Sequence, residues 1–199
     1  AISDQTCAIM VEPIQGEALL RDNISELVML GRTLVTDAAW GLKAAQNRDN
    51  DIRKCVSCNN CWGVINQELP LQCDNNPRVG FEEEVDWWPG AAKTKKKVAV
   101  VGGGVAGLEA AWVAAARGHD VTLYSAGAEL GGKIRLNALI PTCDPLSSIY
   151  DYQQVMATKA GVHTELGWRV SADELIAAKP DAVVLATGST MSWPASLPL

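Results

Sequence analysis

The chain has 199 residues, 48% hydrophobic and 20% charged, a composition typical of a globular protein with a buried core. Its 17 basic and 23 acidic residues give a formal net charge of −6, which argues against the broad basic surface that nucleic acid or an anionic membrane requires. No apolar run approaches the roughly 18 to 20 residues of a membrane span, and the N-terminus lacks a basic segment followed by an apolar stretch, so we expect a soluble, cytoplasmic protein.

The N-terminal part of the chain predicts alternating strands and helices. An apolar run at residues 7–11 predicts a buried strand, residues 13–23 predict a weakly amphipathic helix, and residues 26–32 predict a second buried strand. Strand, helix and strand with short joints form the βαβ unit of a parallel sheet or barrel. Residues 33–46 then predict a further helix.

Four of the six cysteines are clustered and follow the spacing C-x2-C-x2-C-x11-C. In a reducing compartment, such clustering indicates a metal rather than disulfides. Zinc sites usually pair two distant C-x2-C arms, whereas a compact C-x2-C-x2-C loop with a remote fourth cysteine is typical of iron–sulfur cubanes. We therefore favour a 4Fe-4S cluster over zinc or free thiols, and interpret Cys7 and Cys143 as packing residues. The predicted ligands are Cys55, Cys58, Cys61 and Cys73.

Residues 81–97 mix charged, aromatic, Pro and Gly residues without a period, and we interpret them as a linker. The lysines near its end could bind phosphate, but a solvated linker before a strand is the simpler interpretation. Sharper signals follow: a strand at residues 97–101, an Ala-rich helix closed by Gly118, and a strand at residues 120–124. We expect a second domain to begin here.

A glycine motif joins the first of these strands to the helix. Gly102, Gly104 and Gly107 fit G-x-G-x-x-G directly after a strand and at the start of a helix. Without side chains, they let the chain turn tightly, let a pyrophosphate approach the helix amides, and let the helix pack on the strand. The motif predicts dinucleotide binding, and a glycine turn needed only for close packing is the alternative.

Several stretches, taken in order, resemble the iron–sulfur branch of the Old Yellow Enzyme family. That branch includes trimethylamine dehydrogenase, histamine dehydrogenase and 2,4-dienoyl-CoA reductase. The resemblance begins near Pro13, and it is specific because a barrel-end LGR, a cubane loop and a dinucleotide fold follow one another. The stretches are ELVMLGRTLVTDAAW, DIRKCVSCNNCW, CDNNPRVGFE, KKVAVVGGGVAGLEAAWVAAARGHDVTLY, LGGKIRL and PDAVVLATGS.

The resemblance implies an α/β fold with three successive parts. In the family, a TIM barrel binds FMN and the substrate, the cubane takes electrons from FMN, and a Rossmann-like region binds FAD or ADP. Residues 1–45 would be the C-terminal end of the TIM barrel, and residues 46–92 the 4Fe-4S segment and linker. Residues 93–199 would be the first part of the FAD/NAD(P)-type dinucleotide-binding domain. The chain would then be an internal fragment of a longer protein.

The resemblance also implies where the cofactors bind. The FMN phosphate is expected at Gly31 and Arg32, because a guanidinium and backbone amides at a strand end form an anion site. An Arg that merely leaves a strand into solvent is the alternative. Asn59 and Trp62 are expected to shape the cluster pocket. The site for FAD or ADP, with NAD(P)H as a further candidate, is expected at Gly102, Gly104, Val105, Ala106, Gly107, Ser125, Gly131, Gly132, Ala186, Thr187 and Gly188.

Two positions in the nucleotide region depart from the family pattern. Val105 stands where the family usually has Pro, a mild change at a first helical position. Ser125 stands where an acidic residue normally accepts the ribose hydroxyls, and a hydroxyl is no bidentate anionic acceptor. Glu129 could substitute for the missing acid, or it could be an ordinary exposed loop residue.

The expected function is electron transfer between FMN, the cluster and a nucleotide-binding domain, as part of an oxidoreductase. The parent enzyme would resemble an amine dehydrogenase or an NAD(P)H-dependent enoate or dienoyl-CoA reductase, and the cysteine spacing favours the amine dehydrogenases. The alternative is a separate electron-transfer or nucleotide-binding subunit that docks on a barrel partner. Catalytic residues are not assigned, since His119 and His163 are expected to be structural. Candidate partners are a small substrate bound by the missing barrel, an electron-transfer protein and a second copy of the chain.

Overall fold

A computed structural model describes residues 9–10, 21–24, 27–81, 85–190 and 196. The chain divides into two compact units, Ala1–Trp87 and Trp88–Leu199. In the part of the chain that is described, no helix is long and apolar enough to cross a membrane. Cys7 and most of the helix predicted over residues 13–23 lie outside the described residues.

The first unit contains a short parallel pair of strands, β1 (Ile9–Met10) and β2 (Val28–Met29). Parallel strands need a crossover connection, as the predicted βαβ unit requires. The prediction of a fully buried second strand is wrong, because Leu27 is 71% and Met29 59% exposed and a two-stranded pair buries little surface. The helical elements that follow are α2 (Arg32–Thr36), α3 (Trp40–Ala45), the 3-10 helix η1 (Asp49–Asp51) and α4 (Asn60–Asn66).

The single helix predicted after the second strand is instead the pair α2 and α3, and Asp37 separates them. The backbone of Asp37 is extended, and its buried carboxylate accepts hydrogen bonds from the Ala39 amide at 3.1 Å and the Lys43 ammonium at 2.8 Å. The Arg53 amide donates to the same carboxylate at 2.9 Å. An aspartate that captures nearby backbone amides competes with the helical ladder, which explains the break.

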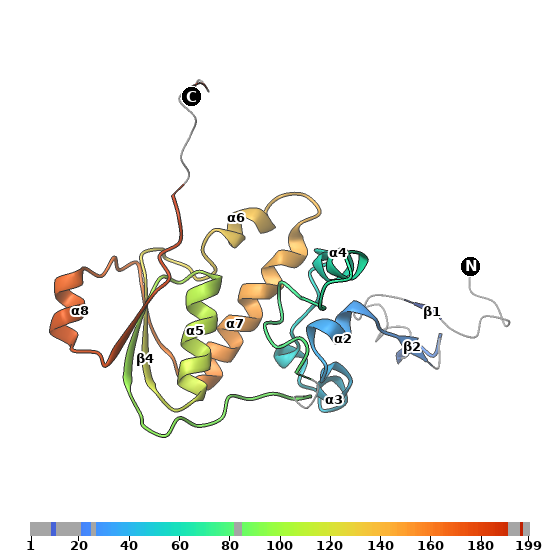
Figure 1. The fold of residues 1–199 in the computed structure, drawn as a ribbon, viewed down its shortest axis with the longest axis horizontal. Coiled ribbons are helices and arrows are strands. Elements are labelled where there is room, and N and C mark those ends of the chain that lie inside the picture. The colour runs from blue at the N-terminus through green and yellow to red at the C-terminus, as the bar shows by residue number, and fades with distance from the viewer. Residues whose placement is uncertain (1–8, 11–20, 25–26, 82–84, 191–195, 197–199) are drawn as a thin grey trace. The chain divides into compact units, whose positions relative to one another are not determined.

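The second unit is a parallel sheet with helices on both sides, and the predicted α/β dinucleotide-binding architecture is confirmed in this respect (Figure 1). Its strands are β3 (Lys97–Val101), β4 (Asp120–Ser125), β5 (His163–Leu166) and β6 (Ala182–Leu185). Its helices are α5 (Val105–Ala116), α6 (Ile134–Ala138), the 3-10 helix η2 (Asp144–Leu146), α7 (Ser147–Ala160) and α8 (Ala172–Ala178).

The strand order is β5-β4-β3-β6, with every neighbouring pair parallel. Helices α5 and α7 pack against each other, and α8 lies on the other side of the strands (Figure 1). Because the strands are parallel, all four carboxyl ends lie at one edge of the sheet. Ligands of open α/β sheets bind outside that edge, so the topology predicts the position of a site.

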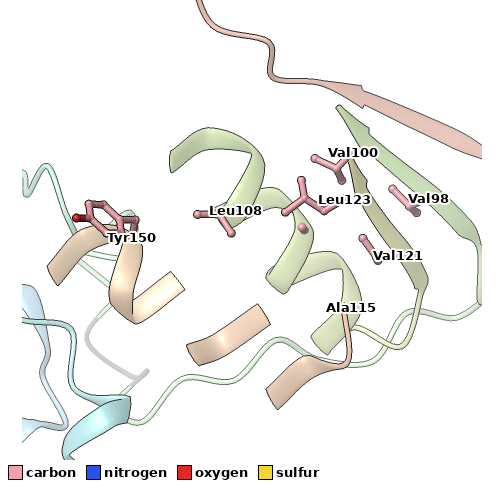
Figure 2. Packing of buried hydrophobic residues seen from close by; sticks show 8 residues of the cluster. Val98, Val100, Leu108, Ala115, Val121, Leu123 and Tyr150 are labelled. Carbon is pink, nitrogen blue, oxygen red and sulfur yellow. The ribbon is translucent and has the colours of Figure 1, made fainter. Parts of the chain in front are cut away.

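The core of this unit lies between the sheet and α5, and Figure 2 shows its side chains. Val100, Leu108 and Leu123 are fully buried, so the central strands and the helix meet in a dry interface. Small residues of α5, Ala111 and Ala115, let the helix lie close to the strands. The apolar run of β3 and the Ala-rich helix thus explain why this βαβ unit forms.

β6 is an edge strand of the described sheet and is much less buried than β3 or β4. The side chain of Val184 is 36% exposed and that of Leu185 is 74% exposed. Its backbone nevertheless pairs with β3 along its whole length, with Val101 opposite Leu185. The residues after β6 therefore emerge beside the loop that follows β3.

Candidate functional site

The turn from β3 into the first turn of α5 has a shape that only glycine allows at two positions. Gly102 has a φ of +118°, and a Cβ at this position would overlap the carbonyl oxygen of Ala186. A Cβ on Gly107 would overlap the carbonyl oxygen of Gly102. The first and third glycines of the motif are therefore required by close backbone packing.

The second glycine of the motif, Gly104, is the N-cap of α5 and carries no side-chain cap. Its backbone forms a bridge with Gly131, and the Gly131 amide donates to the Gly103 carbonyl at 2.8 Å. A Cβ on Gly132 would lie 2.9 Å from the Gly104 Cα. Two glycine loops thus meet at the start of a 12-residue helix, whose first amides have no partners within the helix. This arrangement leaves an uncapped, positively polarised helix end open to an anion.

A cavity of about 560 Å³ lies at the carboxyl edge of the sheet, in front of this helix end. Of the residues predicted to bind the nucleotide, all but Gly107 line it, and Gly107 lies behind the loop against Gly102. The predicted residues that the structure brings together here are Gly102, Gly104, Val105, Ala106, Ser125, Gly131, Gly132, Ala186, Thr187 and Gly188. Glycine backbones and a helix N-terminus are the features that a pyrophosphate needs, so the cavity fits a dinucleotide.

Ser125 closes β4 and is only 4% exposed, yet it lines the cavity. Glu129, which could replace the acidic residue expected at position 125, also lines the cavity. Its carboxylate, however, accepts a hydrogen bond from the Arg135 guanidinium at 2.5 Å. Lys133 donates to the carbonyl and the hydroxyl of Ser189, which connects the second glycine loop to the residues after β6. The carboxylate of Glu129 is therefore already paired with the guanidinium of Arg135.

A group of lining residues that follow β5 was not predicted from the sequence. Trp168 and Arg169 line the cavity together with Ser125. The Trp168 amide donates to the Ser125 carbonyl at 2.9 Å, and the rings of Trp168 and Tyr124 form a T-shaped pair with centroids 5.6 Å apart. Since ligands bind at the carboxyl ends of parallel strands, the position after β5 was the signal that could have identified them.

The cysteine segment of the first unit is held at both ends by one set of hydrogen bonds. The buried Arg53 guanidinium donates to the Asn75 carbonyl at 2.7 Å, and the Asn75 amide group donates to the Lys54 carbonyl at 2.8 Å. These bonds place the residues before Cys55 beside the residues after Cys73. We call these two hydrogen-bonded stretches the stem of the cysteine segment. Cys55 and Cys73, the first and last predicted ligands, both adjoin the stem although they are far apart in the sequence.

The thiols themselves are not arranged as a finished metal site. Among the residues that the structure describes, no group of three or more His, Cys, Asp or Glu is placed to hold a metal ion. Cys58 is exposed, and the other three predicted ligands are half-buried. The Cys73 sulfur lies 3.7 Å from the Thr36 hydroxyl, and the Ser57 amide donates to the Cys55 sulfur at 3.5 Å. As a donor set, four thiols on one short segment fit an iron–sulfur cluster and also fit zinc.

The loop between the thiols is tightly wound and contains left-handed residues. Ser57 has a φ of 55° and Asn59 a φ of 60°. Partial desolvation raises the pKa of the Cys58 thiol, even though the residue is largely exposed; the Asn60 amide opposes this rise, and Asp74 adds to it. A thiol of this kind favours its protonated form until a positive charge approaches.

The two residues predicted to hold the FMN phosphate lie next to the cysteine segment. Gly31 is the N-cap of α2, and Arg32 is the first residue of that helix. The Arg32 guanidinium donates to the Asn59 side-chain oxygen at 2.5 Å. Arg32 is half-buried and contacts the cysteine loop, so it does not simply leave a strand into solvent.

Comparisons with known proteins agree with these features. A family model described as an NAD(P)-binding Rossmann-like domain matches residues 100–154, the segment that contains the glycine loop. The chain is 39% identical to the "NADH oxidase" of Thermoanaerobacter brockii, over 92% of this chain and 28% of that protein.

Two solved structures extend the similarity to the fold. Histamine dehydrogenase from Rhizobium sp. 4-9 matches with a TM-score of 0.84 and 28% identity, over 94% of this chain and 28% of that one. A 2-naphthoyl-CoA reductase matches with a TM-score of 0.87 and 30% identity, over 94% of this chain and 29% of that one. The chain thus spans less than a third of the length of each of these proteins, and they include both an amine dehydrogenase and a CoA-ester reductase.

Proposed function

We propose that this chain belongs to the iron–sulfur branch of the Old Yellow Enzyme family of oxidoreductases and that it carries electrons between FMN, a 4Fe-4S cluster and an adenosine nucleotide. The observation that carries the proposal is the cavity at the carboxyl edge of the sheet, where two glycine loops meet the free end of α5. Electron routing through the cysteine segment is the finer part of the proposal and rests on the four clustered thiols.

In the proposed nucleotide pocket, the first amides of α5 would hold the pyrophosphate. The close approach of Gly104 and Gly132 leaves room for the phosphates, and the helix dipole offsets their charge. Ser125 and the residues after β5, which line the same cavity, would contact the ribose and adenine. FAD, ADP and NAD(P)H share this adenosine portion, and each is a candidate ligand.

In the first unit, Cys55, Cys58, Cys61 and Cys73 would hold the cluster. A bound 4Fe-4S cluster supplies one-electron transfer, with a potential set by nearby hydrogen bonds and solvent exposure. The Arg53 and Asn75 hydrogen bonds hold the stem of the cysteine segment, and the Ser57 amide is positioned to donate to a cysteine sulfur.

Arg32 would bind the flavin in the same unit. We propose that Arg32 and the Gly31 amide bind the FMN phosphate, since a guanidinium can hold a phosphate through two parallel hydrogen bonds. The contact between Arg32 and Asn59 then joins the flavin site directly to the cysteine loop. A flavin and a cluster in such proximity would exchange electrons within one unit of the protein.

For the substrate, we propose only a chemical class. The relatives include an amine dehydrogenase and a CoA-ester reductase, so the parent reaction is either oxidation of an amine or reduction of an activated double bond. A small-molecule substrate bound by barrel residues and a protein electron acceptor are the corresponding proposed partners.

The cluster is tested by anaerobic preparation and metal analysis. We expect about four irons and four sulfides per chain with a brown absorbance, and we expect Cys73→Ser to abolish or severely weaken this loading by removing the remote ligand. Cys143→Ser is the matched control, because Cys143 belongs to the second unit and lies outside the C-x2-C-x2-C-x11-C pattern, and it should load normally. Stoichiometric zinc in a colourless protein would disprove the cluster.

A further inference from the structure

The end of the nucleotide pocket next to β4 and β5 has an unusual balance of charge. The residue that closes β4 is the neutral Ser125, and the nearest lining carboxylate, Glu129, is engaged by Arg135. Arg169 is exposed and lines the same cavity. The lining therefore includes a cationic residue, Arg169, close in the fold to Ser125, the position where a dinucleotide fold often has a carboxylate.

The backbone fixes Arg169 beside the end of β4. In the β4–β5 pairing, Ser125 lies opposite Leu166. Beyond the strands, the Gly167 amide donates to the Gly127 carbonyl at 3.0 Å and the Trp168 amide donates to the Ser125 carbonyl at 2.9 Å. Two consecutive bonds hold the loop before Arg169 against the strand end.

Packing of the neighbouring side chain adds to this restraint. The indole of Trp168 meets the ring of Tyr124 edge to face, with an interplanar angle of 88°. Tyr124 is a residue of β4, so the loop is anchored to the strand by both backbone and side-chain contacts. Arg169 is thus presented from an ordered support at the cavity rim.

The chemistry of this rim favours an anion on the ribose. A carboxylate at the end of the second strand accepts from both ribose hydroxyls and repels a phosphate on the 2′ oxygen. Ser125 does not repel it, and a guanidinium offers a planar fork of donors that matches a phosphate. Ser125 and the guanidinium of Arg169 would not increase the affinity for an unmodified ribose to the same extent.

We propose that Arg169, together with Ser125, makes this pocket selective for adenosine nucleotides that carry a 2′-phosphate, the NADP(H) class, over FAD, ADP or NAD(H). The inference rests on the proposed function, because it requires that the pocket binds the adenosine portion of a nucleotide. To nucleotide binding it adds a preference for a 2′-phosphate and an orientation of the ligand, in which the adenosine ribose faces the loop after β5.

The probes are 2′,5′-ADP, which has a phosphate on the 2′ oxygen of the ribose, and 5′-ADP, which has a free 2′-hydroxyl. Titration calorimetry on the full chain at low salt should show 2′,5′-ADP binding on the order of tenfold more tightly, the gain from one charged hydrogen-bonding contact. Arg169→Met should remove this preference and leave the affinity for 5′-ADP nearly unchanged. Arg117→Met is the control, because Arg117 is exposed at the C-terminal end of α5, the end opposite the glycine loop.

The possible outcomes separate the two proposals. If neither probe binds, the pocket is not a nucleotide site and the proposed function fails for this unit. If both probes bind equally, or if Arg169→Met weakens both alike, the nucleotide site stands and the selectivity for a 2′-phosphate is overturned. Circular dichroism of each variant, together with retained 5′-ADP binding, establishes that the fold is intact.

Discussion

At the scale of single residues, Ser125 is the position where we expect one side chain to determine which nucleotide the pocket accepts. It is almost completely buried, and a Cβ added to Gly103 would lie 2.7 Å from its hydroxyl oxygen. The hydroxyl therefore lies close to the glycine loop, near the path of the nucleotide.

We expect Ser125→Glu to strengthen binding of ADP, NADH or FAD by about 1 kcal/mol, because a carboxylate forms stronger hydrogen bonds with the ribose hydroxyls than a neutral hydroxyl does. The same change should weaken binding of 2′,5′-ADP by repulsion. Calorimetric titration of both variants measures the effect, with Ser125→Ala as a control for the lost hydroxyl. Unchanged affinity for every adenosine nucleotide would mean that Ser125 does not face the ribose.

Residue patterns near in sequence were easier to predict than residues that tertiary structure brings together. Gly102 and Gly107 follow from a local rule, since a strand, a tight turn and a helix within a short span need glycine at fixed positions. The importance of Arg169 depends on strands β4 and β5 lying side by side, which a sequence shows only after the strand order is known. The same limit applies to Arg53 and Asn75, whose contact closes a loop.

At the scale of elements, central and edge strands differ sharply in what they bury. Leu123 of β4 is fully buried between the sheet and α5 (Figure 2), whereas Leu185 of β6 is 74% exposed. The sequence suggests the opposite order of burial, because β6 (AVVL) is entirely apolar and β4 (DVTLYS) alternates polar and apolar residues. Burial depends on the neighbouring layer and was therefore not predictable from the run of residues alone.

These two leucines form a matched pair for a stability measurement. Leu123→Ala should lower the free energy of unfolding by about 2–5 kcal/mol, because it leaves a cavity in a packed core. Leu185→Ala should change it by less than about 0.5 kcal/mol, the usual range for an exposed site. Urea unfolding followed by far-UV circular dichroism compares them, and equal losses would show that β6 is covered in solution.

The break between α2 and α3 shows how a tertiary contact overrides local preference. The residues around Asp37 have enough helical propensity to predict one helix, but Asp37 is drawn into bonds with Lys43 and the Arg53 amide. Arg53 belongs to a later segment of the chain, so its contribution is invisible to any local pattern. The parallel strands of the second unit, in contrast, were predicted because their apolar runs and the intervening helix agree with one another.

At the scale of the whole molecule, the chain consists of two units that contain different sites. The predicted metal and flavin residues lie in Ala1–Trp87, and the nucleotide pocket lies in Trp88–Leu199. A ligand that binds one folded unit stabilises that unit by mass action. The two sites should therefore respond separately to their ligands.

We expect the bound nucleotide to protect only the second unit. At about 100 times its dissociation constant, 5′-ADP or 2′,5′-ADP should stabilise that unit by about 2.7 kcal/mol and should slow amide hydrogen exchange in its strands and in α5. Hydrogen exchange with mass spectrometry assigns the protection to peptides, and α2, α3 and α4 serve as the internal control. Equal protection in both units would show that they unfold as one cooperative structure.

The hydrogen bonds from Arg53 and Asn75 have a consequence for the entropy of metal binding. In an open chain, bringing the first and last cysteines of such a segment together costs conformational entropy that rises with the logarithm of the loop length. Here the polypeptide closes that loop when the first unit folds, and the cost is met by contacts that involve no thiol. If a metal binds as proposed, it would have only to order the short turns between Cys55 and Cys73, and its binding energy would go into bonds to sulfur rather than into restraining the chain.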